Sequence, residues 1–175
     1  DDAPIIRLVN SVLSQAVNDV NVVSAPLIAQ SRGISISESI REAGDYKNFI
    51  RVELQCEDGT RTMGGTVMRR ADARIVSLDG FFLEASPTAL MLVIINRDEP
   101  GVIGRIGTIL GDHKINIADM HLGCKVKHGT AASIVNIDQE LPPEVMEEIR
   151  ALSFIISARL VRLPERLCGR VSQAP

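Results

Sequence analysis

The order of strand and helix patterns between residues 90 and 163 restricts the fold of this chain more than any other feature. Strand and helix patterns follow one another there in the order βαββαβ. The predicted segments are a strand at 90–95, a turn at 97–101, a helix to about 113, strands at 115–122 and 131–137, a helix at 143–152 and a strand at 155–163. This order predicts a ferredoxin-like domain, with an antiparallel sheet and both helices on one face.

The residues before this domain place helices ahead of strands. Apolar residues recur at helical spacing from Ile5 to Arg32, which predicts two helices, and Gly33 follows as a helix stop signal. The apolar period then changes to two, beginning with Ile34 to Ile36. Two hairpins are predicted, one turning at residues 57–59 and one at Asp79-Gly80. The chain as a whole is therefore expected to be α+β.

A domain boundary is expected between these two patterns. Proline and small polar residues interrupt the periodicity from Glu84 to Thr88, which is typical of a linker. We therefore predict one domain at residues 1–86 and a second at 87–163. Residues 164–175 show no period and are expected to be a C-terminal tail.

Composition excludes several classes of protein. With 45% apolar residues, 23% charged residues and a net charge of -3, the chain is expected to fold as a soluble globular protein. The slightly acidic charge and the lack of tryptophan argue against a nucleic-acid binder. No apolar run is long enough for a membrane span, and the first residues lack the features of an export signal. A small molecule or another protein is the expected partner.

The cysteines argue against a disulfide framework or a zinc site. They are Cys56, Cys124 and Cys168, an odd number with no CxxC spacing. A reducing, cytoplasmic setting is therefore expected.

The segment between the first strand and first helix of the second domain is the best candidate for a ligand site. Acidic residues, Pro100 and Gly101 are expected at the start of that helix, where unpaired backbone N–H groups attract a carboxylate. Asp98 can accept hydrogen bonds from an ammonium group, and Asn96 and Asn116 can both donate and accept. These groups suit a free amino acid. The alternative is that Asp98 is only an N-cap and Asn116 only a turn residue before a strand.

Four glycines in and before the same helix need a separate explanation. The spacing of Gly101, Gly104 and Gly107 is GxxGxxG rather than the GxGxxG of a dinucleotide site, so a nicotinamide site is not expected here. We expect Gly104, Gly107 and Gly111 to lie on one helical face packed closely on the sheet. Gly101 is the better ligand candidate.

Other polar clusters give weaker signals. The three histidines, including His121 and His128, have no metal-ligand spacing, and nothing in the sequence orients either of them as a base for Cys124. In the first domain Arg69, Arg70 and Arg74 are candidates for an anion site, although such clusters are usually solvated surfaces.

Several motifs together carry a family resemblance. The run from Leu92 to Gly104 (LVIINRDEPGVIG) and the run from Ile115 to Met120 (INIADM) resemble an ACT domain, an amino-acid-sensing module. Upstream, the runs 20–29 (VNVVSAPLIA) and 74–80 (RIVSLDG) resemble the intervening, allosteric-substrate-binding domain. In this tandem order the chain is similar to the C-terminal regulatory region of the long-form D-3-phosphoglycerate dehydrogenase family.

This resemblance implies a function and a set of site residues. The family oxidises 3-phosphoglycerate with NAD in L-serine biosynthesis and is inhibited by L-serine bound between two ACT domains. Carried over by position, Asn96, Asp98, Gly101 and Val102 fall on the serine-binding turn, and Asn116 falls on the asparagine that reaches the ligand. Arg74 falls on a basic position of the family's anion site. The compartment implied is the cytoplasm, or the plastid stroma for a plant protein.

The sequence does not contain the family's NAD-binding domain or its catalytic residues. We therefore expect a regulatory fragment with no catalytic residue and no cofactor of its own, which binds L-serine and self-associates through its ACT domain. Three alternatives stay open: an oligomerisation module without a ligand, an ACT-type sensor of another amino acid, and an enzyme that uses Cys124.

Overall fold

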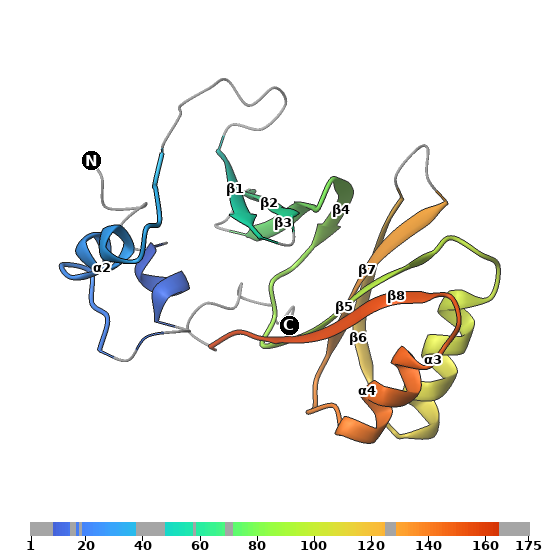
Figure 1. Ribbon diagram of the computed structural model, residues 1–175. Coiled ribbons are helices and arrows are strands. Elements are labelled where there is room, and N and C mark those ends of the chain that lie inside the picture. Colours follow the sequence, from blue (N-terminus) through green and yellow to red (C-terminus); the bar gives the residue numbers. More distant parts are fainter. Residues whose placement is uncertain are drawn as a thin grey trace. The chain divides into compact units, whose positions relative to one another are not determined.

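The computed structural model describes residues 9–14, 17, 19–37, 48–57, 59–68, 72–124 and 129–164. The chain forms two compact units, residues 1–42 and 43–175 (Figure 1). Residues 1–86, which the sequence predicts to be one domain, are therefore divided between the two units. The predicted tail at 164–175 lies outside the described residues except for Pro164.

The first unit is helical. Residues 9–13 are helical, and α2 spans Ala25–Ser31 with Pro26 in its first turn, where a missing N–H is tolerated. Gly33 (φ 72°) ends α2 in the left-handed conformation, as predicted. The predicted strand at Ile34 to Ile36 is wrong. Residues 34–37 have no regular structure, because they follow the helix end and pair with no strand among the described residues.

The first sheet is a four-stranded antiparallel meander. Its strands are β1 (Phe49–Cys56), β2 (Gly59–Val67), β3 (Ala73–Leu78) and β4 (Phe81–Ala85), in the order β1-β2-β3-β4. Both predicted hairpins are confirmed. In the second, Asp79 (φ 46°) and Gly80 (φ 80°) are both left-handed, as a two-residue type I′ turn requires.

The second sheet has the predicted ferredoxin-like topology, which confirms the α+β class. Its strands pair antiparallel in the order β6-β7-β5-β8. Figure 1 shows both helices on one face of this sheet. The elements are β5 (Leu90–Arg97), α3 (Val102–Asp112), β6 (Ile117–Cys124), β7 (Thr130–Ile137), α4 (Pro143–Arg150) and β8 (Ile155–Arg162).

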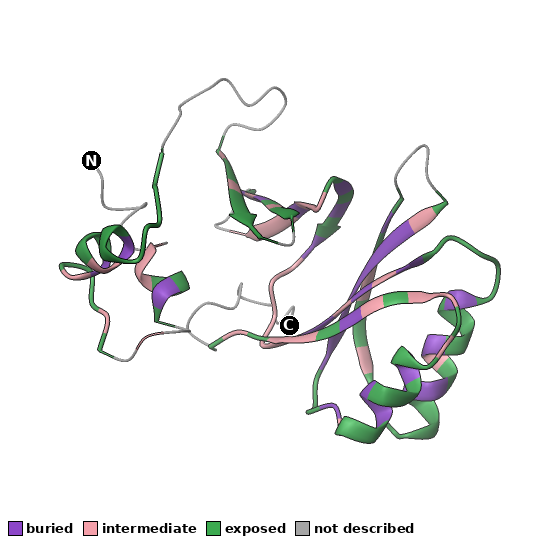
Figure 2. Cartoon of the chain, in the orientation of Figure 1, coloured by how far each residue is buried: buried purple, intermediate pink, exposed green. Residues whose placement is uncertain are grey.

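The core of the second sheet lies under these two helices. From α3, Val102, Ile106, Ile109 and Leu110 are buried, the i, i+4, i+7, i+8 spacing of one helical face, and they pack against central-strand residues such as Leu92 (Figure 2). Burying each such side chain contributes about 1.5–3 kcal/mol. No helix in the described part of the chain is both long and apolar enough to cross a membrane.

β4 packs against part of the opposite face of the second sheet, over β6 and β7. Burial alternates along β4, with Phe81, Leu83 and Ala85 buried against Met91 and Ala132 of the second sheet. The linker therefore begins at residue 86, two residues later than predicted, because the end of β4 still belongs to this core.

Gly123 makes the close contact between β4 and β6 possible. A Cβ atom at this position would lie 2.2 Å from the carbonyl oxygen of Phe82 and 3.2 Å from the Cβ of Leu83. Real Cβ atoms do not come this close to backbone oxygen, so only glycine fits here without a shift of β4.

The glycines of α3 do not pack on the sheet, which corrects the prediction made for them. A Cβ atom at Gly104, Gly107 or Gly111 would meet nothing within 4 Å. The buried face of α3 is formed by its branched apolar residues, and these three glycines lie away from it, so the structure shows no contact that requires glycine at these positions.

Two glycine-to-alanine substitutions test these opposite environments. Gly123→Ala is expected to destabilise the chain by about 1–3 kcal/mol, because the added methyl group overpacks the β4–β6 contact. Gly107→Ala, the matched control, is expected to stabilise it by about 0.5–1 kcal/mol, because alanine favours an open helical position. Urea denaturation of both variants measures this. Shifts of the same sign for the two variants would contradict the packing described here.

Candidate ligand site

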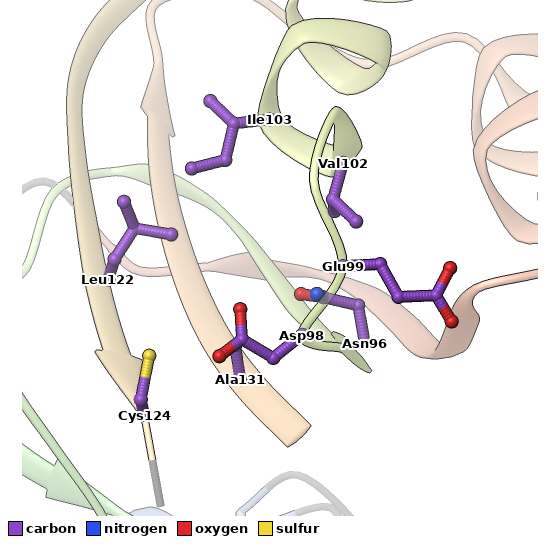
Figure 3. Close-up of a pocket in the computed structure, with 8 residues that line it drawn as sticks. All are labelled: Asn96, Asp98, Glu99, Val102, Ile103, Leu122, Cys124 and Ala131. Carbon is purple, nitrogen blue, oxygen red and sulfur yellow. The ribbon is translucent and has the colours of Figure 1, made fainter. Parts of the chain in front are cut away.

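A small pocket lies where the end of β5, the start of α3 and the edge strand β6 meet (Figure 3). Its volume is about 150 Å³, below the roughly 300–1,000 Å³ of clefts that hold drug-sized ligands. A ligand that fits here is therefore small. The pocket is lined by Asn96, Asp98, Glu99, Val102, Ile103, Leu122, Cys124 and Ala131.

The chain is fixed on both sides as it leaves β5 and enters this pocket. The backbone N–H of Arg97 donates to the carbonyl of Phe154, and the N–H of Asp98 donates to the carbonyl of Gly129, both at 2.8 Å. The loop then turns into α3 through Gly101, whose φ of 92° lies in the left-handed region that glycine tolerates best. These backbone contacts hold the turn, and the side chain of Arg97 adds a hydrogen bond to the carbonyl of Ser153 at 2.7 Å.

Asn96 supplies a buried hydrogen-bond acceptor without a protein partner. Its side chain is 3% exposed, and its Nδ2 donates to the carbonyl of Arg97 at 2.6 Å. Its Oδ1 is buried and accepts no hydrogen bond from the described residues. Figure 3 shows the amide group pointing from the end of β5 toward the centre of the pocket. Leaving such an acceptor unpaired costs about 1–3 kcal/mol, a cost that a ligand donor would remove.

The two acidic residues of the pocket have different environments. The carboxylate of Glu99 forms an ion pair with Arg97, 3.1 Å from its Nε. Asp98 also lines the pocket, and its carboxylate contacts no cation among the described residues. The alternative role for Asp98, N-cap of α3, is wrong, because Gly101 occupies the N-cap position and no side chain caps the helix.

The N-terminus of α3 faces the same pocket through Val102 and Ile103. α3 begins at Val102, after the turn predicted at 97–101, and its first turn contains no acidic residue, although acidic residues were expected there. No side chain accepts a hydrogen bond from the first backbone N–H groups of α3. These N–H groups and the helix dipole favour an anionic group. An acceptor set and an anion-binding end thus lie at one small pocket.

The sequence prediction missed the apolar wall of this pocket. Ile103 is 43% exposed and Leu122 is 47% exposed, and Cys124 and Ala131 complete the wall. The alternation of side chains along β6 could have indicated this wall, since it places Met120, Leu122 and Cys124 on one face of the strand. What the sequence did not reveal is that β6 is the edge strand beside the start of α3.

The remaining predicted site residues lie outside this pocket. Gly101 precedes Val102 but is not among the lining residues, and the Nδ2 of Asn116 donates to the Oδ2 of Asp138 at 2.7 Å. Arg74 donates two hydrogen bonds to the Oδ2 of Asp72, at 2.7 and 3.0 Å. The bond to Asp72 raises the pKa of Arg74 above its usual value. Arg69 and Arg70 lie outside the described residues.

The histidines form surface pairs with single carboxylates. The Nε2 of His113 lies 3.0 Å from Glu148, and the Nε2 of His121 lies 2.7 Å from Asp119. His128 lies outside the described residues. Among the described residues no three histidine, cysteine or acidic side chains come close enough together to hold a metal ion.

Comparison with known families accounts for both sheets. A family model for the D-3-phosphoglycerate dehydrogenase intervening domain matches residues 4–79, and a family model for the ACT domain matches residues 90–154. The chain has the domains of the C-terminal regulatory region of D-3-phosphoglycerate dehydrogenase. The ferredoxin-like sheet is its ACT domain, and the pocket lies entirely within that domain.

Individual relatives agree with this result. The chain is 38% identical over 146 residues to D-3-phosphoglycerate dehydrogenase of Bacillus subtilis (strain 168), covering 83% of this chain and 28% of that protein. It is 32% identical over 162 residues to the Synechocystis protein of the same name, covering 91% of this chain and 29% of the relative. It is 31% identical over 144 residues to D-3-phosphoglycerate dehydrogenase of Methanocaldococcus jannaschii, covering 82% of this chain and 27% of that protein. The chain thus spans less than a third of these relatives.

The pair of Asp119 and His121 makes part of the stability of the ACT domain dependent on pH. The hydrogen bond with His121 is the main cause that lowers the pKa of Asp119 below its usual 3.8, and the Met120 amide and Arg74 lower it further. A carboxylate with a lowered pKa stabilises the fold above its usual pKa, and this contribution is lost as the pH falls through the lowered value.

We expect His121→Ala to raise the pKa of Asp119 toward 3.8, because the substitution removes its main hydrogen-bond partner. Titration of the Asp119 carboxyl carbon by NMR measures the change. The variant is also expected to lose less stability than the original chain as the pH falls below 3.8. An unchanged titration midpoint for Asp119 would contradict this assignment.

Proposed function

We propose that this chain binds free L-serine in the ACT-domain pocket and thereby regulates a D-3-phosphoglycerate dehydrogenase of which it forms part. The observation that carries the proposal is the buried, unpartnered Oδ1 of Asn96, which points into the pocket. Such an acceptor, beside the Asp98 carboxylate, which contacts no cation among the described residues, suits the ammonium group of an amino acid. Feedback inhibition by serine is what the resemblance to this family implies.

The arrangement of charges suits a zwitterion. On this proposal the ammonium group of the ligand contacts Asp98 and Oδ1 of Asn96, and its carboxylate lies against the first N–H groups of α3. The two ends of an amino acid then meet groups of opposite charge within one pocket. A ligand with only one of these charges makes half of the contacts and is expected to bind more weakly.

The size of the pocket supports a small side chain. A volume of about 150 Å³, narrowed by Leu122 and Ile103, leaves little room beyond the backbone atoms of an amino acid. Serine fits this limit, and so do glycine and alanine. The sensor of another small amino acid is therefore the closest alternative function.

Self-association belongs to the same proposal. In the described part of the chain β6 pairs only with β7, so one side of this strand is free to hydrogen-bond a second copy. The exposed side chains of Leu122 and Ile103 lie beside this edge and are available for burial at the same interface. Two pockets would then lie at the interface, close enough for Asn116 of one copy to reach the ligand of the other.

NAD and the dehydrogenase reaction belong, on this proposal, to another domain of the longer enzyme. A dinucleotide site requires a GxGxxG turn at the end of a strand in a parallel sheet. The glycines of α3 have another spacing, and α3 lies on an antiparallel sheet. The residues of this chain do not fit NAD.

The substitution Asp98→Ala tests the site directly. Losing a hydrogen bond to a charged group costs about 1.5–3 kcal/mol, so the affinity for L-serine is expected to fall by about tenfold or more. Isothermal titration calorimetry with L-serine measures this fall. Asp112→Ala is the matched control, because it removes the same charge at the other end of α3, and it is expected to leave the affinity unchanged.

Two further titrations separate the alternatives. Glycine and L-alanine are expected to bind more weakly than L-serine; tighter binding of either would assign the site to another amino acid. Equal affinity of the Asp98→Ala and Asp112→Ala variants for serine would show that the ligand lies elsewhere. No heat with any of the three amino acids would favour an oligomerisation module without a ligand.

A further inference from the structure

We propose that Cys124 is a covalent modification site, which exchanges with small disulfides that carry an ammonium group, and that the attached group closes the ligand pocket. The expectation that the attached group blocks binding of the amino acid rests on the function proposed above. The reaction at the thiol rests on the pocket alone. Its components are the thiol of Cys124, the carboxylate of Asp98 and the buried acceptor of Asn96.

Cys124 is accessible to small molecules. It is the last residue of β6, it is exposed, and its side chain lines the pocket together with Asn96 and Asp98 (Figure 3). It forms no disulfide among the described residues. A thiol inside the core packs like a small apolar group and is inert, whereas an exposed thiol meets reagents in solution.

The second observation is the unpartnered acceptor of Asn96. Its Oδ1 is buried, accepts no hydrogen bond from described residues and points into the pocket that Cys124 borders. It requires a donor from a bound group. A short chain attached to the sulfur of Cys124 and ending in an ammonium group supplies that donor inside the same pocket.

The charges of the pocket select the class of disulfide. The carboxylate of Asp98 contacts no cation among the described residues, whereas Glu99 is paired with Arg97. An ammonium group on the reagent is attracted to the Asp98 carboxylate, while a carboxylate in the same place is repelled by it. Amine-bearing disulfides are therefore expected to react faster at Cys124 than carboxylate-bearing disulfides of the same size.

The exchange is balanced without another reagent. Cys124 loses its proton to solvent, and the thiolate attacks one sulfur of the disulfide. The new S–S bond forms as the bond of the reagent breaks, and the second half leaves as a thiolate that takes up a proton. The sulfur of Cys124 is oxidised, one sulfur of the reagent is reduced, and excess thiol reverses the reaction.

The first experiment measures the rate of this exchange. The full chain with Cys56→Ser and Cys168→Ser keeps Cys124 as its one thiol. Mass spectrometry follows its reaction with cystamine and with dithiodipropionic acid, which are similar in size and opposite in charge. For each reagent, the rate at Cys124 is divided by the rate with free cysteine. This ratio is expected to be at least about tenfold larger for cystamine than for dithiodipropionic acid. This preference should fall in the Asp98→Asn variant, and an equal preference in both chains would overturn the proposal.

The second experiment measures L-serine binding before and after modification. The chain that carries cysteamine on Cys124 is expected to lose binding, and dithiothreitol is expected to restore it. Binding that is equal before and after modification overturns the proposal, although the proposed function stands. If the unmodified chain does not bind serine, the proposed function fails, and the Asp98-dependent rate alone then supports or overturns the modification site.

Discussion

The central strand β5 is the constraint on which the site depends. It is hydrogen-bonded on both sides, to β7 and to β8. Its face toward the helices is buried, and on its other face Met91 packs in one cluster with residues of β4. Because the strand cannot shift, the residues at its end are held in place. Asn96 is therefore kept buried with an unsatisfied acceptor, and the backbone contacts of Arg97 and Asp98 set the direction of the turn into α3. The packed core thus holds a buried acceptor that has no partner among the described residues.

A link between the two sheets follows from the same packing. β4 belongs to the first sheet by its hydrogen bonds and to the core of the second sheet by its buried side chains. Gly123, which accepts the close approach of Phe82, lies one residue before Cys124 of the pocket wall. A ligand that moves β6 is thus expected to act directly on β4.

Much of the fold could be predicted from the sequence, because its signals are local. The Asp79-Gly80 turn and the strand and helix patterns between residues 90 and 163 each depend on a few neighbouring residues, and both predictions are confirmed. Predictions failed where the outcome depends on distant residues. The first turn of α3 was expected to contain acidic residues and Pro100, because such residues are common at a helix start, whereas they lie in the turn before Gly101, which is the N-cap. The glycines of α3 were expected to pack on the sheet, although larger residues occupy that face. Leu122 and Cys124 were missed because only the sheet order shows that β6 is an edge.

The central claim is that a free amino acid lies between Asn96, Asp98 and the first turn of α3. Heteronuclear NMR of the labelled chain during titration with L-serine tests this most directly. We expect saturable shifts of the backbone amides of Val102 and Ile103 and of the side-chain amide of Asn96, with little change along α4 and β8. Saturable shifts that leave these three groups unchanged, or no shifts at all, would contradict it.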